Sequence, residues 1–397
     1  MKKILVINLG WEQEPLLDEL EKHNVEIYGI HNDLNYYKKP KYKDVLVCNI
    51  RDLEKILSYA RKINIDAVIS DECDYSYFAQ ATVAEVLNLP GPRIKEAQLS
   101  INKYLQRKKC EEYNILIPKF KICSNIEDVY EFTDKYKYPI IIKPIDNRGS
   151  FGVNKVNHYG DISEAYINSL VNSHSRLVIV EEFIEGTHIT VDGYSFENIG
   201  IKSLAIAKKS LASKERQVAM DIQYPAIFEE EFYKQILETN ENVNNLLGYS
   251  FGMTHSEYMV TENNKIYLIE SANRGGGVYT SEIIVPEVSG INIVEQYICD
   301  VLNIKKNFFK KNIEKNQVIL KFFDLKLGKI KSIQGVEDLA KQNEVLKLRL
   351  DINIGDTISN ITTDANRHGF IIAKNESLDV NKEINDNIKI VYEKENY

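Results

Sequence analysis

Residues 257–270 read EYMVTENNKIYLIE, two runs of strand-forming residues on either side of a polar turn. The Asn263-Asn264 pair suits a two-residue hairpin loop, because asparagine tolerates positive φ. With this pair as the loop, counting back along both arms sets Glu257 directly opposite Glu270. The hairpin therefore predicts two carboxylates on one face, with Cβ atoms about 4.5 to 5.5 Å apart.

Two like charges at that distance are destabilising unless a cation lies between them. An oxygen-only donor set, with Asn273 as a neutral ligand three residues past Glu270, favours magnesium over zinc. The alternative is an exposed hairpin face whose glutamates are simply solvated. The residues that follow, SANRGGG at 271–277, favour the metal site, because Arg274 and a bare glycine backbone are suited to holding a reacting anion.

A second glycine-containing loop, IDNRGSFGV at residues 145–153, follows an apolar run. Its residues Arg148, Gly149, Ser150 and Gly152 can lay backbone N–H groups and a cation along a phosphate chain. Such a loop alone is a weak signal, since ordinary hairpin turns also have two glycines three residues apart.

Two lysines strengthen the phosphate hypothesis. Lys143 ends the apolar run that precedes the loop, and a lysine in that position needs an anionic partner. Lys103 is a weaker candidate, because the basic residues 107–109 on the same predicted helix allow a solvated basic face instead.

The length of 397 residues, 44% of them hydrophobic, predicts two or three domains. Apolar runs alternate with helical patterns up to a breaker cluster at 89–92, which predicts a parallel α/β domain over residues 1–92. Residues 93–304 read as helices followed by successive strands, an α+β unit with antiparallel sheet. Residues 305–397 are expected to form a third, smaller unit.

Composition argues against several partners. The chain carries 50 Lys plus Arg and 58 Asp plus Glu without a basic block, so nucleic acid and anionic membranes are poor candidates. No signal peptide is expected, the sequence has no 18-residue apolar span, and a cytoplasmic location is expected. Five widely spaced cysteines read as free thiols in a reducing cytosol: Cys48, Cys73, Cys110, Cys123 and Cys299.

Taken in order, these motifs resemble those of the ATP-grasp superfamily. The ordered set is Lys103, Lys143 with its glycine loop, the segment Glu181-Glu182-Phe183-Ile184, and the group Glu257, Glu270 and Asn273. The chain resembles the carboxylate-amine ligase branch, whose relatives include biotin carboxylase, carbamoyl-phosphate synthase and glycinamide ribonucleotide synthetase. The resemblance covers the whole chain and implies a Rossmann-like pre-ATP-grasp domain, a grasp domain with a mobile lid at about 119–183, and a C-terminal α+β lobe.

The resemblance also implies roles for ATP-binding residues. Lys103 and Lys143 would contact ATP phosphates or adenine N7, and the 148–152 loop would fold over the triphosphate. Residues 181–184 would link the two grasp lobes and read the edge of adenine through Glu181 and the backbone at Glu182 and Ile184. At the ribose end many relatives carry Gly-x-Glu, whereas residues 186–188 read Gly-Thr-His. His188 is therefore either a ribose contact, as in biotin carboxylase, or a structural residue.

In the implied reaction a substrate carboxylate attacks the γ-phosphate of ATP, and an amine then displaces phosphate from the acyl phosphate. The resemblance implies two magnesium ions, with manganese as an alternative, on Glu257, Glu270 and Asn273. Lys143 and Arg274 would offset charge on the reacting groups. The implied protein is an ADP-forming ligase acting on a small-molecule acid and amine, with a homodimer also expected.

Several alternatives stay open. A bicarbonate-activating carboxylase or a purine-pathway enzyme would share the superfamily motifs, and a noncatalytic nucleotide-binding regulator would be expected to lose metal ligands. A nucleotide-binding dehydrogenase is disfavoured, because Gly10 stands alone where G-x-G-x-x-G is needed. His255 shares strand parity with Glu257 and either faces the site or packs in the core.

Two further segments are candidates for the acceptor site. The acidic run Asp71-Glu72-Cys73-Asp74 either receives an amine or forms a solvated loop. Gly355-Asp356-Thr357 and Arg367-His368-Gly369 resemble the C-terminal lobe of amino-acid ligases and carboxylases, which would wall the acceptor site.

Overall fold

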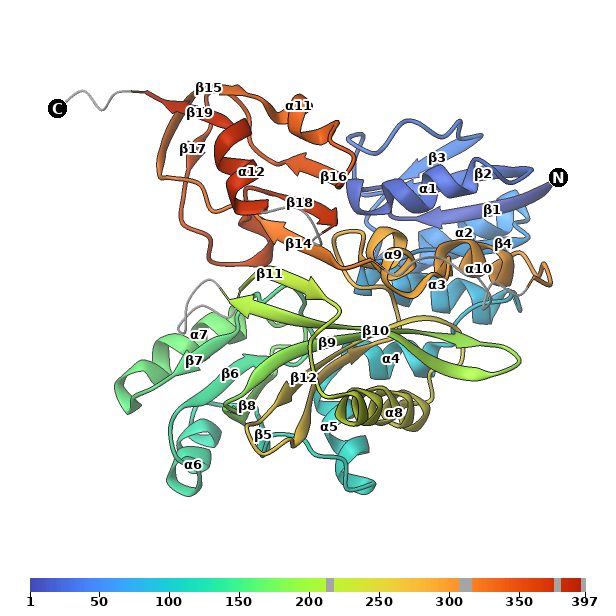
Figure 1. Ribbon diagram of the computed structural model, residues 1–397. Coiled ribbons are helices and arrows are strands. Elements are labelled where there is room, and N and C mark those ends of the chain that lie inside the picture. The colour runs from blue at the N-terminus through green and yellow to red at the C-terminus, as the bar shows by residue number, and fades with distance from the viewer. Residues whose placement is uncertain (212–217, 307–315, 375–379, 394–397) are drawn as a thin grey trace.

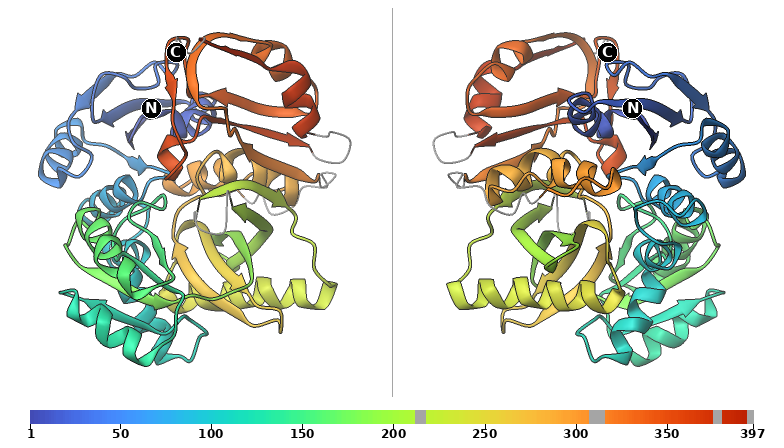
Figure 2. Two further views of the ribbon diagram at one scale, coloured as in Figure 1. Left: turned by 90° about the vertical axis from the view of Figure 1, so that its left-hand side faces the viewer. Right: turned by 90° about the vertical axis from the view of Figure 1, so that its right-hand side faces the viewer.

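Three parts of the chain meet around one cavity in the computed structural model, which describes residues 1–211, 218–306, 316–374 and 380–393. In Figure 1 the N-terminal part (blue) and the C-terminal part (red) lie side by side above the green and yellow central part. The two views of Figure 2 keep this arrangement, with the central part below both.

The N-terminal part is a parallel sheet in the order β3-β2-β1-β4, which confirms the expected α/β architecture. The central strand β1 is buried from Ile4 to Ile7, as an apolar strand covered on both faces should be. Its elements are β1 (Lys2–Ile7), α1 (Glu14–Leu20), β2 (Val25–His31), β3 (Asp44–Val47), α2 (Leu53–Ile63), β4 (Ala67–Ile69) and α3 (Asp74–Val86).

Two helices, α4 (Ile94–Ile101) and α5 (Lys103–Glu112), lead from this sheet into a small antiparallel one, in the order β5-β8-β6-β7. This smaller sheet covers most of the segment expected to act as a lid. Its elements are β5 (Phe120–Cys123), α6 (Glu127–Lys135), β6 (Ile140–Pro144), β7 (Asn154–Val156), α7 (Ile162–Val171) and β8 (Val178–Glu182).

The largest sheet has eight antiparallel strands in the order β13-β12-β9-β10-β11-β14-β18-β16. Its first five strands are β9 (Thr187–Phe196), β10 (Gly200–Leu211), β11 (Ala219–Tyr224), β12 (Gly252–Val260) and β13 (Ile266–Ala272). The helices of this region are α8 (Glu230–Leu247), α9 (Val285–Ser289) and α10 (Ile293–Val301).

The C-terminal part both extends this sheet and forms a three-stranded sheet of its own, in the order β17-β15-β19. Strand β14 pairs with β11, with Val318 opposite Tyr224, so hydrogen bonds run continuously from the central part into the tail. Its elements are β14 (Val318–Phe322), β15 (Gly328–Gln334), α11 (Val336–Ala340), β16 (Val345–Leu350), β17 (Thr357–Ile358), β18 (Gly369–Lys374), α12 (Val380–Asn387) and β19 (Lys389–Tyr392).

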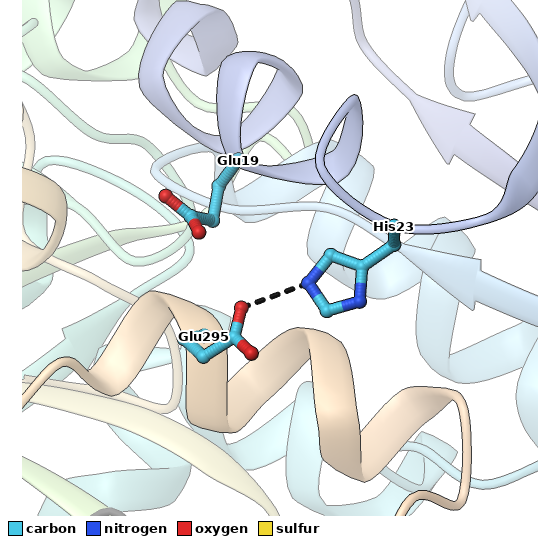
Figure 3. A group of neighbouring side chains, drawn as sticks. All are labelled: Glu19, His23 and Glu295. Atoms are coloured by element: carbon cyan, nitrogen blue, oxygen red, sulfur yellow. Dashed lines mark hydrogen bonds and ion pairs between the residues drawn. The ribbon is translucent and has the colours of Figure 1, made fainter.

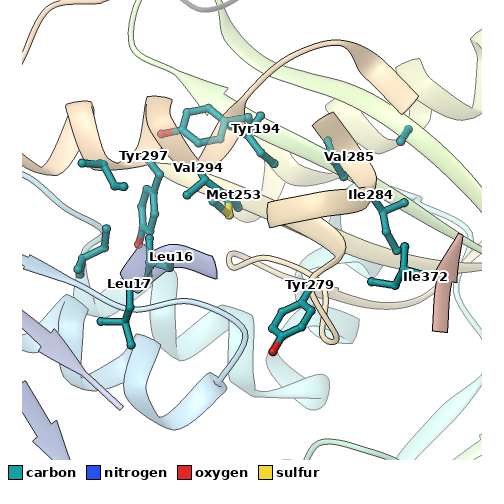
Figure 4. Close-up of a cluster of buried hydrophobic side chains, with 14 of the residues drawn as sticks. Leu16, Leu17, Tyr194, Met253, Tyr279, Ile284, Val285, Val294, Tyr297 and Ile372 are labelled. Carbon is teal, nitrogen blue, oxygen red and sulfur yellow. The ribbon is translucent and has the colours of Figure 1, made fainter. Parts of the chain in front are cut away.

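One hydrophobic cluster draws on all three parts. It joins Leu16 and Leu17 of α1 to Tyr194 of β9, Tyr297 of α10 and Ile372 of β18. Figure 4 shows Leu16, Leu17 and Tyr297 at one end of this cluster and Ile372 at the other, with Ile284 and Val285 towards Ile372. Burial of apolar surface common to the three parts stabilises their relative positions, and therefore the cavity between them.

Two composition-based expectations can be compared with the structure. All five cysteines are free and buried, as the sequence predicts. Within the described ranges, none of the helices combines the length and apolar character needed to cross a membrane.

The hairpin of β12 and β13 pairs Glu257 with Glu270, as the sequence predicts, but by a different route. Near the turn Val260 pairs with Ile266, one residue away from the predicted register, because Thr261 closes a longer turn with its N–H on the Lys265 carbonyl. A register shift between Glu257 and Tyr258 then restores the predicted pair.

Candidate active site

A cavity of about 960 Å³ lies where the small sheet, the large sheet, the N-terminal part and the C-terminal part meet. Most residues predicted for the site line it: Lys103, Lys143, Arg148, Gly149, Ser150, Glu181, Glu182, Phe183, Ile184, His188, Glu257, Glu270 and Arg274. Gly152 and Asn273 are the two predicted residues that do not line it.

The paired glutamates are both matched by cations. Glu257 forms ion pairs with Lys209 and with His188, whose Nε2 lies 2.9 Å from the Glu257 carboxylate. Burial alone would raise the pKa of Glu257, but Lys209 and the two histidines nearby hold it well below its ordinary value. Glu270 lies 2.8 Å from Lys103 Nζ. Two facing carboxylates fit a hard divalent cation such as magnesium.

The structure does not bring Asn273 to the cavity with them. Its side-chain amide donates to the backbone carbonyls of Phe251 and Met253, and Ala272 lines the cavity instead. Asn273 lies one residue beyond the end of β13, and its Oδ1 is buried with no hydrogen-bond partner among the described residues. Its role as a metal ligand therefore stays a prediction.

Lys143 has the anionic partner that its buried position requires. Its Nζ lies 2.7 Å from Glu181, and Arg107 grips the same carboxylate through Nε at 2.8 Å and Nη2 at 3.3 Å. All three side chains are almost fully buried. Glu181 is thus held by two cations, and its contact with the edge of adenine stays a prediction.

Arg107 was missed as a site residue by sequence reasoning, although a signal exists. It stands four residues after Lys103 on α5, so both side chains lie on one helix face. That face is buried, whereas Lys108 is half-exposed, so the solvated basic face proposed for Lys103 is wrong. Lys103 also donates to the Asn147 carbonyl at 2.8 Å, which ties α5 to the glycine loop.

The glycine loop uses left-handed backbone at three positions, Gly149 (φ 64°), Ser150 (φ 60°) and Gly152 (φ 71°). Gly152 is required for packing rather than for the cavity, because a Cβ there would lie 2.8 Å from the Asn172 Cβ. Residues 147–151 and Val153 of the loop line the cavity.

The two histidines near the paired glutamates both contact carboxylates. His188 contacts Glu257, so its side chain lies beside the predicted metal-binding carboxylate. His255 Nδ1 lies 2.7 Å from Asp192 and its Nε2 lies 3.8 Å from Glu257. Burial alone would lower the pKa of His255, but Asp192 raises it above its ordinary value.

Arg274 is held by an acid from the N-terminal part. Its Nε and Nη2 donate to the two oxygens of Asp74, at 2.5 and 3.2 Å. Asp71 accepts from the Gly275 N–H at 2.7 Å, and Glu72 accepts from the N–H groups of Val278 and Tyr279. The acidic run is therefore buried against the segment after Arg274, and the solvated-loop interpretation is wrong.

A further buried acid, Glu282, lies close to Asp71 and Glu72. Burial raises the pKa values of Asp71, Glu72 and Glu282, and interactions among the three raise the values of Glu72 and Glu282 further. Glu72 lines the main cavity, as does Glu12, whereas Glu282 lines a second, smaller cavity.

Another group of acids and a histidine lies outside the main cavity. Glu19, His23 and Glu295 place a ligand atom each within 4.8 Å of one another, and Figure 3 shows them between α1 and α10. His23 Nε2 lies 2.8 Å from Glu295, and Lys22 pairs with Glu19 at 2.5 Å. Because the acids already have cationic partners, this group reads as an ion-pair network joining two helices.

Two family models match the chain. A model of the ATP-grasp domain matches residues 136–282, and a model of the L-amino acid ligase C-terminal domain 2 matches residues 321–392. The first range contains both glycine-containing loops and the paired glutamates, and the second contains most of the C-terminal part.

Comparisons with individual proteins agree with these matches. The chain is 25% identical over 199 residues to the phosphoribosylamine–glycine ligase of Pyrococcus horikoshii, an alignment that covers 49% of this chain and 45% of that protein. The chain therefore spans about half the length of the curated relatives it matches.

Among solved structures, the L-amino acid ligase of Bacillus licheniformis superposes with a TM-score of 0.86 over 99% of both chains at 20% identity. The biotin carboxylase domain dimer of Hydrogenobacter thermophilus 2-oxoglutarate carboxylase, with MgADP, ADP and bicarbonate, superposes with a TM-score of 0.77 at 14% identity. It covers 98% of this chain and 90% of that one.

Proposed function

We propose that this chain joins a carboxylate to an amine in a reaction driven by ATP. The chain has the ATP-grasp fold, with an ATP-grasp domain and an L-amino acid ligase C-terminal domain. The observation that carries the proposal is the facing pair Glu257 and Glu270 in a cavity that also holds Lys103, Lys209 and Arg274. Carboxylates that hold cations, with basic groups beside them, suit phosphoryl transfer from a metal-bound nucleotide.

Glu257 and Glu270 would hold magnesium, which would neutralise charge on the triphosphate. The glycine loop would cover the phosphates through its backbone N–H groups, with Lys103 and Lys143 pairing with phosphate oxygens. A substrate carboxylate oxygen would then bond to the γ-phosphorus as the bond to the β-phosphate oxygen breaks and ADP leaves. Arg274 would stabilise the oxyanion formed when an amine attacks the acyl carbon and phosphate departs.

The amine is best accommodated near the acids of the N-terminal part. Glu12 and Glu72 line the cavity together with Trp11, and carboxylates beside an aromatic ring suit an ammonium group. The ammonium must lose one proton before its nitrogen can attack, and Glu72 is the buried carboxylate available to accept that proton. Amino acids are the first substrates to test, since the matched C-terminal domain is that of L-amino acid ligases.

The decisive experiment is a screen of amino acids, alone and in pairs, for magnesium-dependent phosphate release from ATP. The product of each active pair is then identified by mass spectrometry. An acid labelled with ¹⁸O in its carboxylate should transfer one labelled oxygen to the released phosphate, as an acyl phosphate requires. Phosphate without label, or turnover without an amide product, would overturn the proposed reaction.

The alternatives give different results in the same screen. A carboxylase would show turnover that depends on bicarbonate and not on the amine. A nucleotide-binding regulator would bind ATP in a calorimeter but release no phosphate with any acid. A purine-pathway enzyme would respond to a phosphoribosyl amine but not to pairs of amino acids.

A further inference from the structure

Arg367, from the C-terminal part, is a buried cation that lines the main cavity. Only 11% of its side chain is exposed, and its guanidinium carbon lies 3.7 Å from the centroid of the Phe322 ring. Its one ion-pair partner among the described residues is Asp364, at 2.6 Å from Nη2, and its Nε is buried with no hydrogen-bond partner there. A buried guanidinium with an unused donor is costly unless an anion joins it.

The backbone around Arg367 is attached to the glycine loop. The Asp364 N–H donates to the Gly149 carbonyl at 3.3 Å, so the 364–367 turn lies against the loop proposed to cover the phosphates. Arg367 is also close enough to Glu257 for that carboxylate to counteract the effect of burial, which lowers the pKa of Arg367. The guanidinium thus lies near both the glycine loop and one of the paired glutamates.

The other cations near the paired glutamates already have carboxylate partners. Lys103 pairs with Glu270, Lys209 with Glu257 and Arg274 with Asp74. Arg367 also has a carboxylate partner, Asp364, but it keeps an Nε donor with no partner among the described residues. A planar guanidinium can hold two oxygens of one phosphoryl group at once, which a lysine cannot.

We propose that Arg367 binds the γ-phosphoryl group of ATP, so that the C-terminal part supplies a catalytic cation to the site. This inference rests on the proposed function and adds a residue to it. The strands that extend the central sheet would then have a role in the site. Phe322, on which Arg367 stacks, ends β14, and β18 begins two residues after Arg367.

The test compares the binding of MgATP and MgADP by calorimetry, because the two nucleotides differ only in the group that Arg367 is proposed to hold. Arg367→Met should lose about 10- to 100-fold in affinity for MgATP, the effect of one lost charged hydrogen bond or two, while affinity for MgADP changes less than about twofold. Arg367→Lys should keep part of the preference for MgATP over MgADP that Arg367→Met loses. Lysine keeps the positive charge but lacks the two parallel N–H donors of a guanidinium.

Arg349→Met is the matched control. Arg349 belongs to the same part of the chain, stacks on an aromatic ring (Trp11, 4.5 Å) and pairs with an acid two residues away, but it does not line the cavity. Its substitution should leave the ATP-to-ADP ratio unchanged. If Arg367→Met fails to fold, as judged by thermal unfolding, the ratio for Arg367→Lys decides in its place.

Equal losses for both nucleotides, or no loss, would overturn the inference. So would an effect confined to the Michaelis constant of the acid, which would make the anion a substrate carboxylate. These outcomes differ from a failure of the proposed function, in which the wild-type protein itself would not bind MgATP or would turn over no acid.

Discussion

Replacing Glu270 by glutamine removes one of the two facing carboxylates and keeps the size of the side chain. Glu270 lies 2.8 Å from Lys103, and Lys103 also donates to the Asn147 carbonyl, so a glutamine oxygen can still accept from the lysine. Because 29% of the Glu270 side chain is exposed, the loss of stability should be about 1 to 2 kcal/mol, below the 3 to 5 kcal/mol of a broken buried pair. Turnover should fall by at least about a hundredfold, since a bound metal supplies several kcal/mol to the transition state.

Phosphate release is measured over a series of magnesium concentrations, and stability is measured by urea unfolding of the same samples. Glu262→Gln, an identical change at the exposed tip of the same hairpin, is the control and should alter neither. Turnover near the wild-type level with an unchanged requirement for magnesium would refute the assignment of Glu270 as a metal ligand.

Three further substitutions test other parts of the site. Lys143→Ala should weaken ATP binding by about 1.5 to 3 kcal/mol in calorimetry, and unchanged affinity would leave Lys143 only its structural pairing with Glu181. Arg274→Lys should lower kcat and kcat/KM for the acid together, by about a hundredfold to a thousandfold. The Michaelis constant for ATP should stay constant, and a defect in ATP affinity alone would contradict the role given to Arg274. Burial and the neighbouring acids raise the pKa of Glu282 in the folded protein. Its protonated side chain therefore contributes fully to stability at a pH below the ordinary glutamate pKa, and this contribution is lost as the pH rises towards the pKa of the folded protein. Glu282→Gln should therefore gain stability relative to wild type between pH 5 and pH 8 by about 1 to 3 kcal/mol in urea unfolding, and a pH-independent difference would count against it.

Local sequence rules predicted the paired glutamates because strand pairing and alternation act over a few residues. Even so, the predicted turn was one residue out of register, and a bulge beside Glu257 compensated for it. A bulge depends on how both neighbouring strands pack, which residues 257–270 alone do not reveal. Asn273 lies just beyond the end of β13, and its amide is held by the backbone carbonyls of Phe251 and Met253, which the sequence around it does not reveal.

The partners of the charged residues could not be predicted from the sequence. Asp74 and Arg274 are 200 residues apart, and Lys103 and Glu270 are 167 apart. Such pairs form only when separate parts of the chain dock, so no local pattern encodes them. The acidic run at 71–74 reads as a solvated loop in the sequence because the backbone N–H groups that hold it come from residues 275–279.

The charged groups of the cavity pair with one another, and this pairing has a consequence for binding. A divalent cation held by Glu257 and Glu270 would displace Lys209 and Lys103 from those carboxylates, and the released lysines would then need anions that a triphosphate supplies. The nucleotide would bind the lysines that compete with the metal, and the metal would bind the carboxylates that compete with the nucleotide. The two should therefore bind with a favourable coupling free energy of about 1 to 3 kcal/mol, so that each raises the affinity of the other by the same factor of about 5 to 150. Calorimetry with and without magnesium, corrected for the binding of magnesium to free ATP, measures this coupling. Lys209→Met should reduce it, because Glu257 then has one competitor fewer. A coupling that is absent, or that survives unchanged in Lys209→Met, would show that these ion pairs do not exchange partners when ATP binds.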